Sequence, residues 1–234
     1  GVLKRMLTQI KHRGLDYNGV FISDQVGLGV TRRRLISGIV TSIPLGNEEE
    51  SEWIVWSGKI FNHEDLKAKL LALGHMFKTK CDDELMLHLY REYGKDCLTM
   101  INGQFAFSIW NAAKNELFLA RDCVGICPLY YSHTANGFVF ASEIKALFEY
   151  PQISPAISAE TLLQIVTFWS PISTATIFQG IYELSPGHYL TLNSNGIKSG
   201  IYWNYPVFRP DEYSNLSLTE SIDQLDHLLG DAVA

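Results

Sequence analysis

The sequence predicts an α+β fold in which mostly antiparallel sheets pack against helices. Amphipathic helical patterns lie near both ends of the chain, and short strand patterns separated by turn signals fill residues 103–142. No internal repeat is present. The chain has 234 residues, of which 47% are hydrophobic, enough to bury a large core. We therefore expect a layered globular domain.

The first fifty residues predict one helix, one hairpin and a loop. Apolar residues of 2–12 recur on one helical face, and Gly14 follows as an end signal. The short apolar runs 19–23 and 26–32 predict the two strands of a hairpin. The segment that follows contains glycine, proline and a glutamate run, which are typical of a loop.

The stretch from Trp53 to Asn62 predicts a buried strand that ends in a tight turn at Ser57-Gly58-Lys59. Asn62 is expected to cap the next helix, whose apolar stripe consists of Leu66, Leu70 and Leu73. The acidic run 82–84 opens a second helix, where negative charge suits the helix dipole. A glycine turn at a strand end is a common place for a small-molecule site, so this turn is a candidate site.

The remainder of the chain predicts strands, two short helices and a final amphipathic helix. Strands are expected at 105–110, 116–121, 129–132 and 138–141, helices at 143–149 and 159–168, and extended segments at 177–184, 188–192 and 197–203. A Ser217-x-x-Glu220 capping box opens the last helix. We expect one domain at 1–210 and, at 211–234, a helical linker into a second domain absent from this chain.

Composition argues against several classes of function. The net charge is −6, from 19 Lys and Arg against 25 Asp and Glu, which is unlike a general nucleic-acid binder. No apolar run reaches the length of a membrane span and no secretory signal opens the chain, so we expect a cytoplasmic protein without membrane contact. The four cysteines and seven histidines lack metal-ligand spacing, so we expect no metal site.

Seven motifs occur in one order along nearly the whole chain. They are His12-Arg13-Gly14-Leu15-Asp16, Ser57-Gly58-Lys59-Ile60-Phe61-Asn62, Asp82-x-Glu84, Gly103-x-Phe105-Ala106-Phe107, Ala120-Arg121-Asp122-x-x-Gly125-Ile126-x-Pro128-Leu129-Tyr130-Tyr131, Ser142-Glu143-Ile144-Lys145-Ala146-Leu147 and Pro186-Gly187-His188-Tyr189. Their order and spacing resemble the N-terminal glutaminase domain of glutamine-dependent asparagine synthetases. The resemblance implies a four-layer αββα sandwich of the N-terminal-nucleophile hydrolase type, the fold of class II glutamine amidotransferases.

The resemblance also implies a reaction and a set of partners. In the family, a cysteine at the mature N-terminus attacks the side-chain amide of glutamine, and its own α-amino group is the base. The released ammonia passes to a C-terminal synthetase domain that activates aspartate with ATP. The resemblance therefore implies that glutamine is the ligand and that the synthetase domain is the partner. Assembly of the protein as a homodimer is a further expectation. ATP and Mg are expected only in the downstream domain, and no cofactor is expected here.

Carried over residue by residue, the resemblance implies an altered substrate site. The family's Asn-Gly-Glu turn reads Ser57-Gly58-Lys59, so Ser57 replaces an amide donor and Lys59 puts a cation where an acid meets the substrate ammonium. Gly58 retains a backbone N–H. Asp82 matches the second ammonium ligand, although an aspartate there is equally typical of a helix N-cap. The carboxylate-binding arginine corresponds to Arg32 in a gapless alignment and to Arg34 in a gapped one.

These departures predict a degenerate amidotransferase-like domain that does not hydrolyse glutamine. Residue 1 is glycine and the first cysteine is Cys81, so no catalytic residue is assigned. The alternative is an active glutaminase domain, supplying ammonia, whose N-terminal cysteine segment is missing from this sequence. Arg121-Asp122 is expected to be a buried structural pair rather than a catalytic one.

Overall fold

The computed structural model describes residues 1–32, 44–207, 209 and 216–233. The chain divides into two compact units, Gly1–Asn204 and Tyr205–Ala234. All described strands belong to the first unit, and the second contains the helix α6 (Leu218–Val233).

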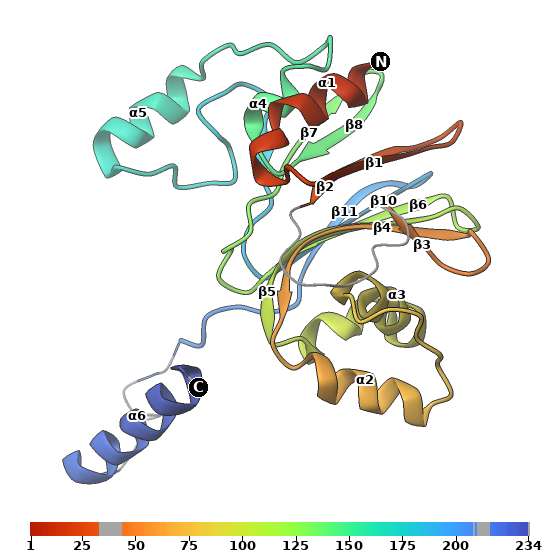
Figure 1. Ribbon diagram of the computed structural model, residues 1–234. Helices are drawn as coiled ribbons and strands as arrows, with labels where there is room; N and C mark the ends of the chain where they lie inside the picture. Colours follow the sequence, from red (N-terminus) through yellow and green to blue (C-terminus); the bar gives the residue numbers. More distant parts are fainter. Residues whose placement is uncertain (33–43, 208, 210–215, 234) are drawn as a thin grey trace. The chain divides into compact units, whose positions relative to one another are not determined.

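The larger sheet of the first unit is antiparallel and has the strand order β11-β10-β6-β5-β4-β3. Its strands are β3 (Leu45–Gly46), β4 (Glu52–Ile60), β5 (Gly103–Asn111), β6 (Glu116–Arg121), β10 (His188–Asn193) and β11 (Gly196–Ile201). The helices α2 (His63–Ala72) and α3 (Asp82–Tyr93) cover one face of this sheet (Figure 1). A 3-10 segment, Gly94–Met100, continues from α3 toward β5.

The opposite face of the six-stranded sheet meets two smaller sheets. One is the hairpin of β1 (Tyr17–Ile22) and β2 (Gly27–Arg32), and the other has the order β8-β7-β9. The latter contains β7 (Tyr130–Thr134), β8 (Gly137–Ala141) and β9 (Tyr182–Glu183). Outside them lie α1 (Val2–Gln9) and α4 (Ile144–Leu147) (Figure 1). The layers therefore follow the order αββα, and the expected four-layer sandwich is confirmed.

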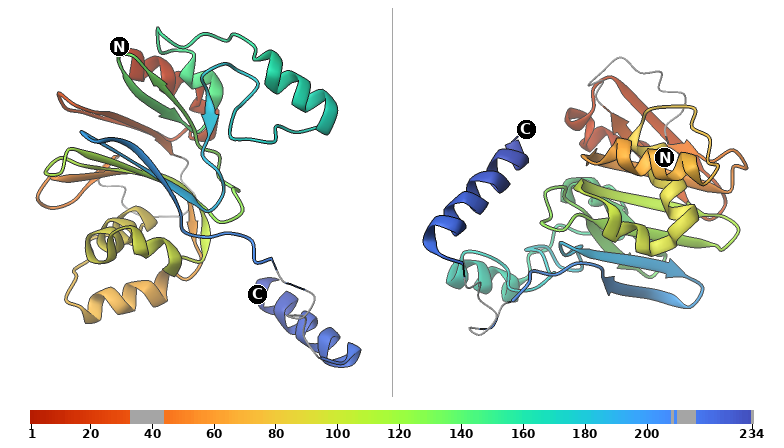
Figure 2. Two further views of the ribbon diagram at one scale, coloured as in Figure 1. Left: turned by 180° about the vertical axis from the view of Figure 1, so that it is seen from behind. Right: turned by 90° about the horizontal axis from the view of Figure 1, so that it is seen from below.

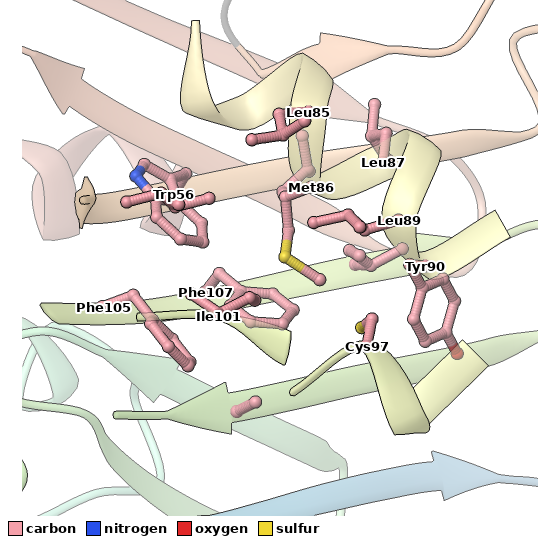
Figure 3. Close-up of a cluster of buried hydrophobic side chains, with 14 of the residues drawn as sticks. Trp56, Leu85, Met86, Leu87, Leu89, Tyr90, Cys97, Ile101, Phe105 and Phe107 are labelled. Carbon is pink, nitrogen blue, oxygen red and sulfur yellow. The ribbon is translucent and has the colours of Figure 1, made fainter. Parts of the chain in front are cut away.

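Three hydrophobic clusters correspond to the three spaces between these layers. Under α3, Trp56 of β4 stacks on Phe107 with ring centroids 5.6 Å apart, and Figure 3 shows Met86 reaching toward this pair. Between the sheets, Val55 belongs to the second cluster, because successive side chains of a strand point to opposite faces. The third cluster joins α1 and α4 to β8. One sheet thus separates two cores, which explains why β4 is apolar on both faces.

The strand β4 runs without a break through Ser57, Gly58 and Lys59, so the expected tight turn there is wrong. Gly58 pairs with Phe105 of β5 and has φ +141°. A Cβ atom at Gly58 would lie 2.0 Å from the carbonyl oxygen of Gln104. The glycine that suggested a turn is instead required because the two strands approach closely.

Two expectations about α2 are also corrected. Asn62 occupies the N-cap position, but its side chain makes no capping hydrogen bond. Its Nδ2 donates to the carbonyl of Met100 at 2.9 Å, and its Oδ1 accepts from the N–H of Asn102 at 3.0 Å. The expected apolar stripe is confirmed at Leu66 and Leu70, which are buried, but is wrong at Leu73, which is more than half exposed.

The strands expected between 103 and 142 are present, but they divide between two sheets: β5 and β6 in the larger, β7 and β8 in the smaller. At the other end, Ser217 and Glu220 form the expected capping box, each accepting from the backbone N–H of the other. None of the helices in the described ranges is long and apolar enough to cross a bilayer.

Candidate functional site

Asp82 links the end of β4 to the starts of α2 and α3. Its Oδ2 accepts a hydrogen bond from the backbone N–H of Ile60 at 3.1 Å, and its Oδ1 lies 2.7 Å from Nδ1 of His63. The ammonium of Lys59 lies 3.3 Å from the same Oδ1. The Asp82 side chain is buried whereas that of Lys59 is 57% exposed, so the lysine reaches the carboxylate from the solvent side.

The alternative that Asp82 caps its own helix is wrong. Cys81 occupies the N-cap position of α3, and the helix has no side-chain cap. Asp82 is the first residue of the helix, and its carboxylate points away to β4 and α2. An aspartate in the first turn still benefits from the positive end of the helix dipole. The burial of this carboxylate is offset by three donors rather than by a cap.

His63, the first residue of α2, is part of the site although no motif or spacing pattern in the chain selects it. The imidazole is buried, and its Nε2 has no hydrogen-bond partner among the residues that the structure describes. When Asp82 is ionised, Nδ1 of His63 donates to it, which leaves Nε2 as the unprotonated acceptor of the neutral ring. His63 and Asp82 are 19 residues apart, and only the packing of α2 against α3 brings them together.

Arg32 lies at the end of β2 and forms an ion pair with Asp83, the neighbour of Asp82. Asp83 is almost fully buried, and this burial raises the pKa of its carboxyl above the ordinary value even though the Arg32 guanidinium acts in the opposite direction. The pairing places Arg32 within one residue of Asp82 along α3. Arg34, the other candidate for the carboxylate ligand, lies outside the described residues.

A cavity of about 520 Å³ adjoins Ser57 between the two layers of strands. It is mostly apolar, and the strand residues that line it include Gly29 and Val30 of β2, Val55 and Ser57 of β4, and Phe138 and Val139 of β8. Side chains of α1 cover the cavity from outside, with Leu3, Met6 and Leu7 among its lining residues. In the described strands β2 pairs only with β1, and β8 only with β7. Both unpaired edges contribute to the wall of the cavity.

Charge in this region is balanced within the chain. Two buried aspartates, Asp82 and Asp83, are each paired with one cation, Lys59 and Arg32. The described residues contain no group of three or more His, Cys, Asp or Glu side chains arranged to hold a metal ion. The arrangement can bind an ammonium group at Asp82, which Lys59 now does, and it can present the Ser57 hydroxyl to the cavity.

Arg121 and Asp122 are both buried, and their side chains hold the surrounding backbone in place. Asp122 accepts hydrogen bonds from the N–H groups of Phe105, Val124, Ile126 and Cys127 at 3.0–3.2 Å. Arg121 donates to the carbonyls of Gly125, Cys127 and Leu184 and pairs with Glu183, each at 2.7 Å. The two residues fix the turn after β6, in agreement with the expected structural role.

Comparison with known proteins gives consistent results over nearly the whole chain. A family model described as "Glutamine amidotransferase domain" matches residues 1–203. Asparagine synthetase [glutamine-hydrolyzing] 3 of Bacillus subtilis (strain 168) is 32% identical over 234 residues, covering 99% of this chain and 38% of that protein. Asparagine synthetase [glutamine-hydrolyzing] 2 of the same organism is 34% identical over 241 residues, covering 99% of this chain and 32% of that protein.

A fungal protein and a solved structure extend the comparison. Amidase chry2 of Gibberella zeae is 33% identical over 229 residues, covering 94% of this chain and 33% of that protein. The structure of glutamine phosphoribosylpyrophosphate amidotransferase from B. subtilis matches with a TM-score of 0.63 and 21% identity, covering 86% of this chain and 46% of that one. At that identity the structural match supports the fold alone. The chain spans about a third of the length of the two synthetases and the fungal amidase.

Proposed function

Because the chain belongs to the glutamine amidotransferase domain family and is related to the glutamine-hydrolysing asparagine synthetases, we propose that it is a degenerate amidotransferase-like domain of such a protein. In this domain Lys59 occupies the subsite for the ammonium group of glutamine. The domain supports a partner synthetase domain, which alone uses ATP and Mg, in a cytoplasmic protein. Asparagine formation from aspartate, glutamine and ATP is the reaction of the family to which the whole protein is related.

The contact between Lys59 and Asp82 carries this proposal. The resemblance assigns Asp82 to the substrate ammonium, and a lysine ammonium lies 3.3 Å from its Oδ1. A second positive charge brought to the same carboxylate at about 4 Å would be opposed by roughly 1–4 kcal/mol, between the water and protein-surface limits. Because Lys59 is largely exposed, the lower part of this range applies. Free glutamine must therefore displace Lys59 before its ammonium reaches Asp82.

Glutamine binding measured by calorimetry tests the proposal. The chain with its own Lys59 is expected to show no saturation in the millimolar range, because the Lys59 ammonium already pairs with Asp82 and opposes a second positive charge there. Lys59→Glu combined with Ser57→Asn restores an acid and an amide donor, and we expect affinity to rise by roughly tenfold or more.

Lys114→Glu is the matched control, because it changes the net charge equally in the exposed turn between β5 and β6. Glutamine affinity of that variant should equal that of the unaltered chain. Tight binding of glutamine by the unaltered chain would contradict the proposal, and so would equal gains in both variants.

A second candidate function is glutamine hydrolysis by a longer chain that contributes a cysteine-bearing strand. The cavity between the unpaired edges of β2 and β8 supports it, because an additional strand there would pair on both sides and bury apolar side chains. Glutamate release by the natural full-length protein would favour this candidate and contradict a silent domain. Absence of release, together with restored glutamine binding in the double variant, would favour the degenerate domain.

A further inference from the structure

The ion pair of Arg32 with Asp83 lies beside the Asp82 subsite, because Asp82 and Asp83 are the first two residues of α3. Arg32 is the last residue of β2, and Figures 1 and 2 show β2 and α3 on opposite sides of the larger sheet. Burial is the main cause that raises the pKa of Asp83 and the charge of Asp82 is a lesser one, so the two carboxylates interact electrostatically. An acceptor for a cation and a partner for an anion therefore adjoin each other at the start of α3.

These side chains include the partners that an α-amino acid requires, and each partner is already occupied. An α-amino acid carries an ammonium and a carboxylate on one carbon atom, so its recognition needs an acid and a cationic side chain that are close together. The resemblance gives these roles to Asp82 and, in the gapless alignment, to Arg32. In this chain the ammonium of Lys59 pairs with Asp82, and the carboxylate of Asp83 pairs with Arg32. The chain thus supplies both charges of an amino acid from its own side chains.

The two internal pairs differ in how easily a ligand can replace them. The Lys59 side chain is 57% exposed, so its ammonium can turn into solvent when another cation approaches Asp82. The side chain of Asp83 is only 6% exposed and that of Arg32 is 20% exposed. A carboxylate that loses its partner while it stays buried is strongly destabilised, so Asp83 does not release Arg32 to a ligand. The ammonium of a ligand can therefore enter the subsite, whereas a carboxylate finds no free partner at Arg32.

We propose that Asp83 is a specificity-determining residue: by pairing with Arg32, it makes the Asp82 subsite accept primary amines without an α-carboxylate and reject α-amino acids. The inference rests on the proposed function, because it takes Asp82 as the acceptor of a ligand ammonium. It goes beyond that function by adding a second obstacle to glutamine, which no change at Ser57 or Lys59 removes. If the ion pair only fastened β2 to α3, the choice between the two classes of ligand would not depend on Asp83.

Two ligands that differ only in the α-carboxylate test the inference. They are glutamine and 4-aminobutanamide, which is glutamine without that group. Each is titrated by calorimetry into the 234-residue chain that carries both Lys59→Glu and Ser57→Asn, the double variant expected to bind an ammonium group. We expect this variant to bind 4-aminobutanamide at least as tightly as glutamine, because the carboxylate of glutamine meets no free cation and is repelled by Asp83.

Asp83→Ser added to the double variant should free Arg32. Glutamine affinity should then rise about tenfold relative to the affinity for 4-aminobutanamide, because Arg32 can pair with the carboxylate of glutamine. Asp83→Asn is a second variant, which keeps nearly the same side-chain shape and removes only the charge, and it should move the ratio of the two affinities in the same direction. Far-UV circular dichroism of each variant should match that of the double variant.

Glu49→Gln is the matched control, because it frees Arg91 of α3 from an exposed ion pair outside the site. It should leave the ratio of the two affinities unchanged. A ratio that neither Asp83 variant changes, although the double variant binds both ligands, would overturn the inference and leave the proposed function intact. Much tighter binding of glutamine than of 4-aminobutanamide by the double variant would overturn it as well. Absence of binding of either ligand would overturn both, because Asp82 would then accept no ligand ammonium.

Discussion

Asp82 shows how one residue can hold three elements and a binding subsite together. Its carboxylate accepts from the backbone of β4 and from His63 of α2 while it starts α3. Because these donors fix both oxygens, the carboxylate keeps its position whether or not Lys59 is present. A small ammonium ligand would therefore find an oriented acceptor in a Lys59 variant. At this scale the site is organised by tertiary contacts that no local pattern reveals.

A second residue-scale feature is the pair formed by His75 and by His88 of α3. Nδ1 of His75 lies 3.0 Å from Nδ1 of His88, and Nε2 of His75 lies 3.1 Å from a Glu92 oxygen. Partial burial, followed by the charge of His75, lowers the pKa of His88 below its ordinary value. One of the two rings must remain unprotonated to accept the hydrogen bond between them.

The lowered pKa of His88 predicts acid sensitivity. The unfolded chain binds a proton at His88 more readily than the folded chain, so stability present above about pH 6.5 is lost as the pH falls below that value. In His88→Gln the fall in the free energy of unfolding between pH 7 and pH 5 should be smaller, as measured by urea denaturation. His227→Gln, on exposed α6, should retain the original slope. Equal slopes in all three proteins would contradict this interpretation.

At the scale of the element, β4 is the strand on which the first two cores depend. Its pairing with β5 extends from Glu52 to Ile60, and Gly58 allows the close approach of the two backbones. The sequence pattern predicts a buried strand here but places Gly58 in a turn at its end. Glycine is compatible with a turn and with a close backbone contact, and only the position of β5 distinguishes them.

Replacement of Gly58 by alanine tests this explanation. A Cβ atom would lie 2.0 Å from the Gln104 carbonyl oxygen and 2.7 Å from Cα of Phe105, so the strands must separate. We expect Gly58→Ala to lower the free energy of unfolding by about 3 kcal/mol or more. Gly74→Ala is the control: Gly74 has φ +92° but no atom within 4 Å of the added Cβ, so its cost should be only about 1 kcal/mol. Equal losses of unfolding free energy in the two variants would show that the positive φ, and not the close approach of β5, makes Gly58 necessary.

Helices, hairpins and caps could be predicted where a local sequence pattern is enough to specify them. The helix from Val2, the hairpin of β1 and β2, and the capping box of α6 follow from periodicity and turn residues, and all are observed. The division of β5 to β8 between two sheets was not predictable, because it depends on which distant strand each edge meets. The same reason hid the contact of His63 with Asp82 and the pairing of Arg32 with Asp83, since each joins residues that lie far apart in the sequence.

On the scale of the whole molecule, the chain consists of two units, the layered unit and the unit that contains α6. No residue of α6 is buried, although the helix has an apolar stripe that includes Ile222, Leu225 and Leu229. The layered unit contains all three hydrophobic clusters. Burial of apolar surface supplies most of the stability of a domain, so the layered unit should be stable by itself.

Removal of residues 205–234 tests the independence of the layered unit. We expect the thermal unfolding midpoint of chain 1–204 to stay within about 4 °C of that of the full chain, since every residue of the three hydrophobic clusters lies within 1–204. The measurement is differential scanning calorimetry at equal protein concentration. A larger fall would mean that the helix contributes to the stability of the unit.

The outer strand of the larger sheet has a consequence for solubility. In the described part of the chain β11 pairs only with β10, so its other edge offers free backbone groups to any strand that approaches. Gly196 and Gly200 make β11 a poor partner for an additional strand. Lys198, in the middle of β11, places a positive charge at this edge, and the β11 strand of another molecule would carry the same charge and be repelled. Growth of an amyloid-like ribbon from this edge is thereby discouraged.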